Sequence, residues 1–241
     1  MKRRSFLAAA GSSGALTTHA SSSAPRTTPL KLAGRSPEEL RSAYRAFLFD
    51  DFIPFFDAHV IDSDYGGFMY NRDRDGSPIS TDKGAWYEGR GMWVYSFIYN
   101  ELERDPRFLD VAAKSASLVL RMKPEGDAFW PATFTREGVP AGKPAPNMYG
   151  DLYIAAGLAE YACAAGDPDM WAAARDILVK CLRIYDRPDY DSIRTGPDPV
   201  EGPRRQNIVM LVLPVATSLL KYRKDREIEA IAAAQVDAVI S

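Results

Sequence analysis

An alternation between two kinds of predicted helix constrains the fold of this chain more than any other feature. Some segments are apolar around the whole helix circumference, which is typical of buried helices, and others are apolar on one side only, which is typical of surface helices. The one-sided segments cover residues 36–60, 107–122, 167–185 and 224–240, and the apolar segments cover residues 85–103, 148–165 and 206–221. Because each apolar segment lies between two one-sided segments, we predict helical hairpins in which one helix of each pair faces a common centre.

A ring of such hairpins is an α/α toroid, although a helical bundle or an open solenoid would give a similar alternation. With 46% apolar and 11% aromatic residues among its 241, the chain can bury a core of the required size. We therefore predict an all-α domain over residues 36–241, built from three and a half hairpins. Small β-hairpins are predicted at the rim, around Phe68–Gly76 and around Phe129–Gly138.

The first 20 residues have the composition of an export signal. Arg3-Arg4 precede Phe6-Leu7 and an apolar run rich in alanine and glycine, and Thr18-His19-Ala20 offers small residues for cleavage. This arrangement resembles a twin-arginine export signal, which a receptor reads and which is no part of the fold. We predict a signal over residues 1–20, a flexible lead-in over residues 21–35 and a periplasmic or otherwise extracytoplasmic location. A disordered basic tail is the alternative.

Charge and composition exclude several classes of function. The formal net charge is −2 and the acidic and basic residues are interspersed, so the sequence carries no electrostatic footprint for nucleic acid. No apolar run is long enough to span a membrane, so we expect no membrane contact beyond the export signal. Cys163 and Cys181 have no metal-ligand spacing and are interpreted as small buried side chains, with a disulfide as the alternative. Asp73 and Asp75 are interpreted as turn residues, and no metal site is predicted.

An arginine on an aromatic stripe is the most informative local feature. The stripe recurs at helical spacing in the segment 85–103 and consists of Trp86, Arg90, Trp93 and Phe97. A buried guanidinium is costly unless it is paired or has a task. Arg90 is therefore either held by an ion pair to Glu88 or Asp151, or it serves a ligand, and we favour the ligand.

Several short stretches from residue 66 to residue 93 resemble the N-acylglucosamine 2-epimerase family, which includes renin-binding proteins and cellobiose 2-epimerases. They are Gly66-Gly67-Phe68, Asp73-Arg74-Asp75-Gly76, Asp82-Lys83 and Trp86-Tyr87-Glu88-Gly89-Arg90-Gly91-Met92-Trp93. A weaker similarity extends through Asn147-Met148-Tyr149-Gly150-Asp151 and the helix at Met210–Pro214. The resemblance implies a six-hairpin (α/α)6 barrel, of which this chain would be the N-terminal half, truncated inside its seventh helix.

The resemblance also implies a reaction, namely inversion at C2 of a mono- or disaccharide in its open-chain form. An isomerase of this kind removes the proton next to a carbonyl from one face and returns it on the other, which needs two acid/base groups with pKa values near neutrality. It needs a fixed positive group where enolate charge develops. Arg90 matches the family arginine beside the substrate, and its guanidinium stays ionised. We expect no cofactor.

The sequence departs from the family pattern at the catalytic histidines, which relatives carry in the second half of the barrel. The two histidines of this chain are His19, in the predicted signal, and His59, which is interpreted as structural. No catalytic residue is therefore assigned, and we expect impaired activity. The alternatives are a non-catalytic carbohydrate-binding fragment and a six-hairpin glycosidase relative, which would need paired carboxylates.

Other substrate-binding residues are predicted around Arg90. Trp86 and Trp93 either stack on a sugar face or pack in the core, and Glu88 is expected to orient Arg90 or the substrate. Tyr149 and Asp151 start a buried helix at the end where the pocket would open, and Asp151 is equally well explained as a helix cap. Half a barrel would expose a large apolar patch, which a homodimer would bury.

Overall fold

The computed structural model describes residues 31–142, 145, 147–187 and 206–240. The chain divides into two compact units, Met1–Phe47 and Leu48–Ser241. The predicted export signal, residues 1–20, lies outside the described residues. Among the helices described here, none is both long and apolar enough to cross a membrane.

The first helix, α1 (Pro37–Ala46), begins where the sequence predicts. Ser36 is its N-cap, and the Ser36 hydroxyl accepts a hydrogen bond from the Glu39 amide while the Glu39 carboxylate accepts one from the Ser36 amide. A π-helical segment, η1 (Phe47–Phe52), and the short helix α2 (Ile53–His59) follow. Proline lacks an amide hydrogen and disturbs the preceding turn, so Pro54 explains why the helix predicted over residues 36–60 changes its hydrogen-bond pattern here.

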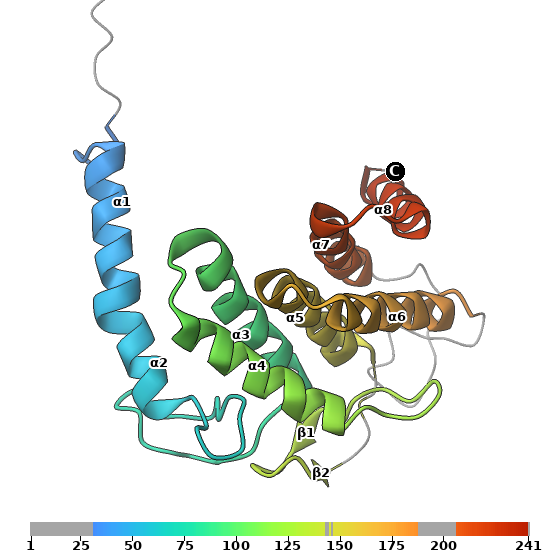
Figure 1. The fold of residues 1–241 in the computed structure, drawn as a ribbon, viewed down its shortest axis with the longest axis horizontal. Coiled ribbons are helices and arrows are strands. Elements are labelled where there is room, and N and C mark those ends of the chain that lie inside the picture. Colours follow the sequence, from blue (N-terminus) through green and yellow to red (C-terminus); the bar gives the residue numbers. More distant parts are fainter. Residues whose placement is uncertain (1–30, 143–144, 146, 188–205, 241) are drawn as a thin grey trace, which may run out of the picture. The chain divides into compact units, whose positions relative to one another are not determined.

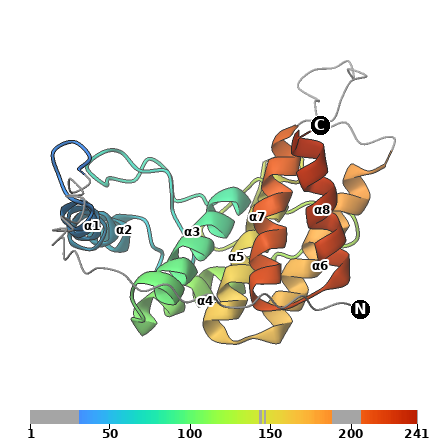
Figure 2. The same ribbon diagram turned by 90° about the horizontal axis from the view of Figure 1, so that it is seen from above.

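The remaining helices confirm the predicted alternation. They are α3 (Ala85–Phe97) with its π-helical extension η2 (Ile98–Leu102), α4 (Pro106–Arg121), α5 (Tyr149–Ala165), α6 (Pro168–Tyr185), α7 (Gln206–Tyr222) and α8 (Arg226–Ile240). The apolar helix α5 lies between α3 and α7 and packs against both (Figure 1, Figure 2). We call α3, α5 and α7 the inner helices, and α4, α6 and α8 the outer helices that cover them.

The outer helices begin at predictable signals. Asp105 and Asp167 are N-caps whose carboxylates accept hydrogen bonds from amides of the first turn, and each is followed by a proline at the first helical position. Gly166 ends α5 in the left-handed conformation, which glycine adopts without strain. The turn between α5 and α6 is therefore encoded in three consecutive residues, 166–168.

Where the loops between the helices are described, they contain one short regular hairpin, β1 (Thr133–Phe134) paired with β2 (Pro140–Ala141), as predicted around residues 129–138. The other predicted hairpin, at residues 68–76, is an irregular loop in the described chain, closed by isolated bridges such as Arg72 with Pro78. Its tip is the expected turn, since the Asp75 carboxylate accepts hydrogen bonds from both the amide and the hydroxyl of Ser77.

Candidate functional site

The face that carries Arg90 is open and aromatic. Trp86 and Arg90 lie one helical turn apart on α3, and both side chains are exposed. The Trp86 ring stacks on Tyr153 of α5, with ring centroids 5.0 Å apart, and lies 6.1 Å from the ring of Tyr149. The Arg90 guanidinium lies over the Tyr153 ring at 5.6 Å. This cluster joins the inner helices α3 and α5 at one surface.

The third inner helix contributes a polar group to the same surface. Asn207, in the first turn of α7, donates a hydrogen bond from its side-chain amide to the Tyr149 hydroxyl. Trp86, Tyr149 and Asn207 all stand in the first turn of their helices. The N-terminal ends of the inner helices therefore meet here, and their unpaired amides make this end of the structure electropositive.

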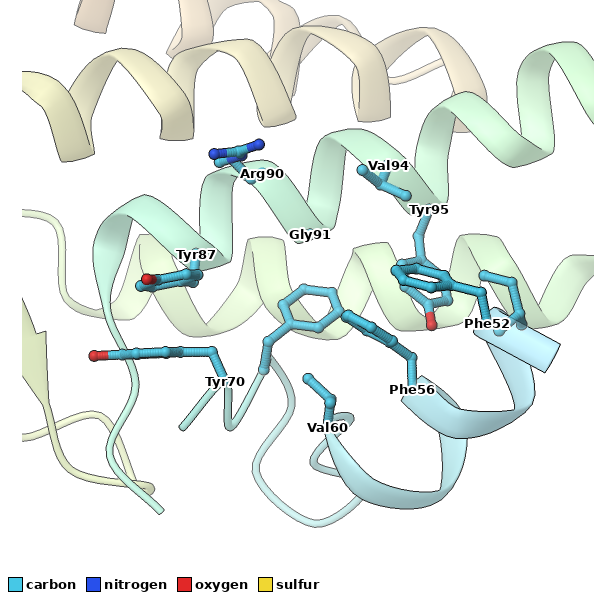
Figure 3. A pocket seen from close by; sticks show the side chains of 11 residues that line it. Phe52, Phe56, Val60, Tyr70, Tyr87, Arg90, Gly91, Val94 and Tyr95 are labelled. Atoms are coloured by element: carbon cyan, nitrogen blue, oxygen red, sulfur yellow. The ribbon is translucent and has the colours of Figure 1, made fainter. Parts of the chain in front are cut away.

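A second aromatic pair lies on the other side of Arg90. Tyr70, from the loop before α3, stacks on Tyr87 with ring centroids 3.7 Å apart and an interplanar angle of 11°. Figure 3 shows this pair beside Arg90 at one end of a cavity of about 380 Å³. Arg90 thus stands between two stacked pairs, one made with α5 and one made with the loop.

Arg90 has no acidic partner among the described residues, since neither an ion pair nor a hydrogen bond holds its guanidinium. The alternative that Glu88 or Asp151 neutralises it is therefore wrong for this structure. An exposed, unpaired guanidinium framed by aromatic rings is able to receive a ligand oxygen through its planar donors. This geometry supports the ligand interpretation of Arg90.

Glu88 points away from this face. It is fully buried, and its carboxylate accepts hydrogen bonds from the Phe68 amide at 2.8 Å and from the Ser115 hydroxyl at 2.6 Å. Burial raises the pKa of Glu88 to about 7, because these hydrogen bonds and the nearby charge of Lys83 only partly offset the lost solvation. Glu88 therefore joins the glycine-rich loop to α3 and α4, and the structure does not bring it to the predicted substrate face.

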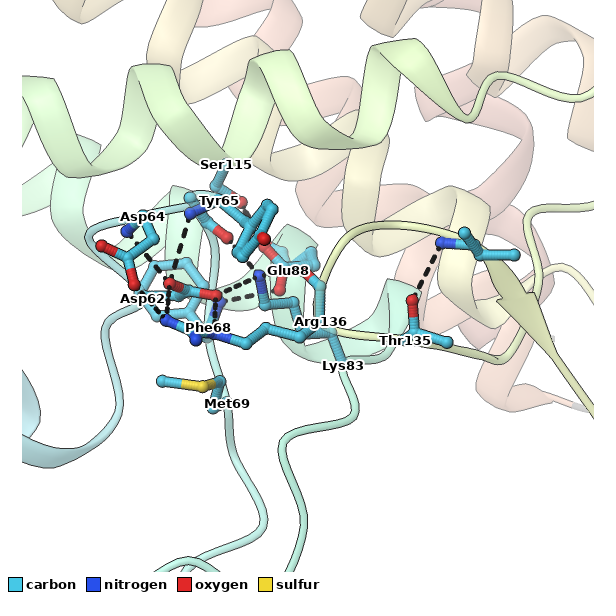
Figure 4. A network of polar contacts seen from close by, with 12 residues as sticks. Asp62, Asp64, Tyr65, Phe68, Met69, Lys83, Glu88, Ser115, Thr135 and Arg136 are labelled. Carbon is cyan, nitrogen blue, oxygen red and sulfur yellow. Dashed lines mark hydrogen bonds and ion pairs between the residues drawn. The ribbon is translucent and has the colours of Figure 1, made fainter.

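Asp62 and Lys83 form the charged half of the same network (Figure 4). The Lys83 ammonium is completely buried and lies 2.8 Å from the Asp62 carboxylate, while it also donates to the carbonyls of Gly66 and Arg136. The Arg136 guanidinium donates to both Asp62 oxygens at 2.8 Å. Burial alone would raise the pKa of Asp62, but these two cations outweigh it and hold the pKa well below its usual range. Asp62 is ionised because it has cationic partners, whereas Glu88 has neutral ones.

Asp151 is also structural. It is fully buried in the first turn of α5, where it accepts hydrogen bonds from the Trp130 amide at 3.0 Å and from the Lys180 ammonium at 2.7 Å. Met148, and not Asp151, occupies the N-cap position of α5. Asp151 therefore ties α5 to α6 and to the loop before β1, away from Arg90. The cap interpretation of Asp151 is wrong in detail.

Trp93 and His59 occupy structural surroundings. Trp93 is half buried and stacks on Phe97, with ring centroids 4.9 Å apart. The His59 ring packs against Phe55 and over Gly76, where an added Cβ would lie 2.4 Å from it. This placement agrees with the structural interpretation of His59. The described residues include no group of acidic, histidine and cysteine side chains suited to a metal ion, and both cysteines are free thiols.

The glycines of the motif allow close contacts. A Cβ on Gly89 would lie 2.2 Å from the backbone of Tyr153, and one on Gly91 would lie 2.3 Å from the Phe68 ring. Gly89 thus lets α3 and α5 approach closely enough for Trp86 and Arg90 to reach Tyr153. Sequence analysis missed Tyr153 and Asn207, although Tyr153 stands four residues after Tyr149, at the spacing that places two side chains on one helix face.

These observations define a toroid of helical hairpins with an open arginine and aromatic face at the N-terminal ends of its inner helices. A family model described as N-acylglucosamine 2-epimerase (GlcNAc 2-epimerase) matches residues 66–240. The chain belongs to the N-acylglucosamine 2-epimerase family. It is 35% identical to the N-acylglucosamine 2-epimerase of Mus musculus over 74 residues, and 34% identical to that of Rattus norvegicus over 82 residues. These segments cover 30% and 32% of this chain, and 18% and 20% of the relatives.

Solved structures show the same fold. The cellobiose 2-epimerase of Spirochaeta thermophila superposes with a TM-score of 0.69 at 19% identity, and that of Bacillus thermoamylovorans with 0.71 at 15% identity. Each superposition covers 83% of this chain, and 53% and 55% of the respective solved chains. The chain therefore spans about half the length of these structures, as the predicted half of an (α/α)6 barrel does.

Proposed function

We propose that this chain carries the substrate-binding side of a sugar 2-epimerase of the N-acylglucosamine 2-epimerase type. Family membership supports the reaction class. The observation that carries the proposal is the exposed, unpaired Arg90 between two aromatic pairs. Aromatic faces suit the C–H surface of a sugar ring, and a guanidinium suits its oxygens.

The position of Arg90 leads us to infer one step of such a reaction for it. When the C2 proton leaves an open-chain sugar, negative charge develops on the oxygen of the adjacent carbonyl. The Arg90 guanidinium would donate hydrogen bonds to that oxygen, and the electropositive helix ends around Trp86, Tyr149 and Asn207 would favour the same charge. The stacked rings would hold the sugar in place during inversion.

The groups around Arg90 do not include the acid/base pair that inversion requires. In the described part of the chain its neighbours are tyrosine, tryptophan and asparagine, and such side chains do not ordinarily have pKa values near neutrality. Burial, with the neighbouring Tyr87 and Asp82, raises the pKa of Tyr70 further. This observation favours a second candidate function, carbohydrate binding without catalysis. A glycosidase is not favoured, because it would need paired carboxylates in the site, and Glu88 and Asp151 are both buried and hydrogen bonded.

An exchange and binding experiment tests both functions. The purified chain is incubated in D₂O with N-acetylglucosamine, N-acetylmannosamine, mannose and cellobiose, and deuterium at C2 is followed by NMR while affinity is measured by calorimetry. We expect binding of at least one sugar, and Arg90→Gln should weaken it by about tenfold or more, since a hydrogen bond to a charged group is lost. Any exchange should fall by about 10²-fold or more.

Arg104→Gln is the matched control, because the Arg104 guanidinium also lies 5.6 Å from an aromatic ring, that of Tyr99, and is exposed. This variant should behave as the wild type. Exchange at C2 supports the epimerase, and sugar binding without exchange supports the binding function. Equal affinity of the Arg90→Gln variant and the wild type would contradict both.

We further propose that residues 1–20 direct export through the twin-arginine route. A fusion of residues 1–25 to a reporter protein should reach the periplasm, and replacing both Arg3 and Arg4 by lysine should keep the reporter in the cytoplasm, because the receptor reads the arginine pair. Export of the lysine variant at the wild-type level would contradict this assignment.

A further inference from the structure

The cavity beside Arg90 has one polar end and is apolar elsewhere. Its volume of about 380 Å³ falls within the range of about 300–1,000 Å³ that is typical of small-molecule sites. Among the described residues that line it, only Arg90 and three tyrosines carry polar side-chain groups, and the others are apolar or glycine. One of these tyrosines, Tyr95, already donates its hydroxyl hydrogen bond to Asp57 at 3.2 Å. The polar end therefore consists of Arg90 with the stacked pair of Tyr70 and Tyr87.

The apolar part of the cavity lies between two helical segments (Figure 3). Val94 stands one helical turn after Arg90 on α3, and Phe52 and Phe56 line the cavity from η1 and α2. The Phe52 ring stacks on the Phe56 ring with centroids 4.4 Å apart. Val94 and Phe52 are 36% and 39% exposed although both line the cavity. The described chain thus leaves apolar surface here, and covering it with an apolar group would be favourable.

An unsubstituted sugar ring matches only the polar end. Such a ring carries a hydroxyl group on nearly every carbon, and burying hydroxyls against Val94, Phe52 and Phe56 without hydrogen-bond partners is costly. Beside Arg90, in contrast, a guanidinium is available for the sugar oxygens and tyrosine rings are available for the C–H faces. The apolar part therefore suits a group that the ring carries, and not the ring itself.

We propose that this cavity is a subsite for an apolar substituent of the bound sugar, namely an acyl chain longer than acetyl. The inference rests on the proposed sugar site and names the class of sugar derivative that this site prefers. With the ring at Arg90, the chain would run along α3 past Gly91 and lie between Val94 and Phe52. Gly91 has no side chain, and the Phe68 ring occupies the place where one would be, since an added Cβ would lie 2.3 Å from it. The floor beneath the chain is therefore also apolar.

Isothermal titration calorimetry of the purified chain with N-acetyl-, N-butanoyl- and N-hexanoylglucosamine tests the subsite. We expect the dissociation constant to fall by about tenfold or more from the acetyl to the hexanoyl derivative, because the added methylene groups leave water. Hexanamide has the same acyl chain without the sugar ring. It should bind at least about tenfold more weakly than the hexanoyl derivative, because it lacks the ring that the polar end receives.

Two wall variants locate the acyl chain. Val94→Trp narrows the cavity and Phe52→Ala removes part of the opposite wall, and each should reduce the gain in affinity from acetyl to hexanoyl to about threefold or less. Both positions are partly exposed, so we expect both variants to fold. Val139→Trp is the matched control, since Val139 is 59% exposed between β1 and β2 and does not line the cavity. This control should keep the full gain.

Arg90→Gln separates the subsite from the proposed function. It should weaken all three derivatives by a similar factor and keep the gain with chain length, because Arg90 contacts the ring. Equal dissociation constants of the three derivatives for the wild type, an unchanged gain in both wall variants, or binding of hexanamide as tight as that of the hexanoyl derivative would overturn the subsite alone. Failure of every sugar derivative to bind would refute the proposed function, and the subsite with it.

Discussion

Replacing Glu88 by glutamine isolates the energetic role of the buried network. The Glu88 carboxylate accepts hydrogen bonds from the Phe68 amide and the Ser115 hydroxyl, and it is near the ion pair of Lys83 and Asp62. A glutamine keeps the shape and one acceptor oxygen for the Phe68 amide. Its amide group can donate to the Ser115 hydroxyl, which is able to accept. The substitution thus removes the titration while it retains the contacts.

The sign follows from the direction of the pKa shift. The pKa of Glu88 is about 7 in the folded chain and 4.5 for an unperturbed glutamate, so the folded state binds a proton that the unfolded state has lost between these values. The contribution of Glu88 to stability is fully present below pH 4.5 and is lost as the pH rises through about 7. Between pH 5 and pH 8 the loss amounts to roughly 2.5 kcal/mol. The Glu88→Gln variant should not show it.

Urea unfolding at half-unit steps from pH 5 to pH 8 measures the difference between variant and wild type. We expect the free energy of unfolding of Glu88→Gln, relative to the wild type, to increase with pH by roughly 2.5 kcal/mol over this range. Other titrating groups cancel in the difference. Glu125→Gln, at an exposed position, should give a flat difference. A flat difference for Glu88→Gln as well would refute the argument that a buried carboxylate with neutral donors titrates near neutrality.

Two further predictions concern the packing around Arg90. Gly89→Ala should destabilise the chain by about 2 kcal/mol in the same urea assay, because the added Cβ would lie 2.2 Å from the backbone of Tyr153. Replacing glycine by alanine within a helix ordinarily stabilises by about 1 kcal/mol. A gain in stability would therefore contradict the close approach of α3 and α5. Asp62→Asn should lower the free energy of unfolding by about 3–5 kcal/mol, because it leaves the Lys83 ammonium buried without its anion. Asp110→Asn removes the exposed ion pair with Lys114 and should lower it by no more than about 0.5 kcal/mol. Equal losses of stability would show that burial does not decide how much these ion pairs stabilise the chain.

The helix pattern was predictable because it depends on burial alone. A helix that contacts solvent on one side has an apolar stripe, and the segments that became α4 and α6 have such stripes with proline and aspartate at their starts. The start of α1 is equally explicit, since Ser36 and Glu39 are residue types that form a capping box, as they do here. These signals are local, so they can be recognised in the sequence without knowledge of which helices pack together.

The direction of each side chain on an inner helix was not predictable. In a one-sided helix the polar residues mark the exposed face, so the buried face can be read from the sequence. Because α3 and α5 are apolar nearly all round, their sequences do not show which face is buried. Glu88 and Arg90 are only two residues apart, which places them on different faces of α3, yet both were predicted to meet the substrate. Asp151 was misplaced for the same reason. The structure shows that Phe68 and Ser115 cover the face of α3 that carries Glu88, and that Lys180 covers the face of α5 that carries Asp151.

The stretch from Trp86 to Gly91 therefore combines attachment and binding within one and a half helical turns. The hydrogen bonds of Glu88 join α3 to the glycine-rich loop and to α4, and the lack of a side chain at Gly89 lets α5 pack closely against α3. Trp86 and Arg90, at positions i and i+4, share the face that remains open. Because the attachments surround the open face, a change in the loop at Gly67 would act on Arg90 through Glu88, since an added Cβ there would lie 2.4 Å from the Glu88 carboxylate. The contacts of Gly67 and Phe68 with Glu88 therefore couple the rim loop to the turn of α3 that also carries Arg90.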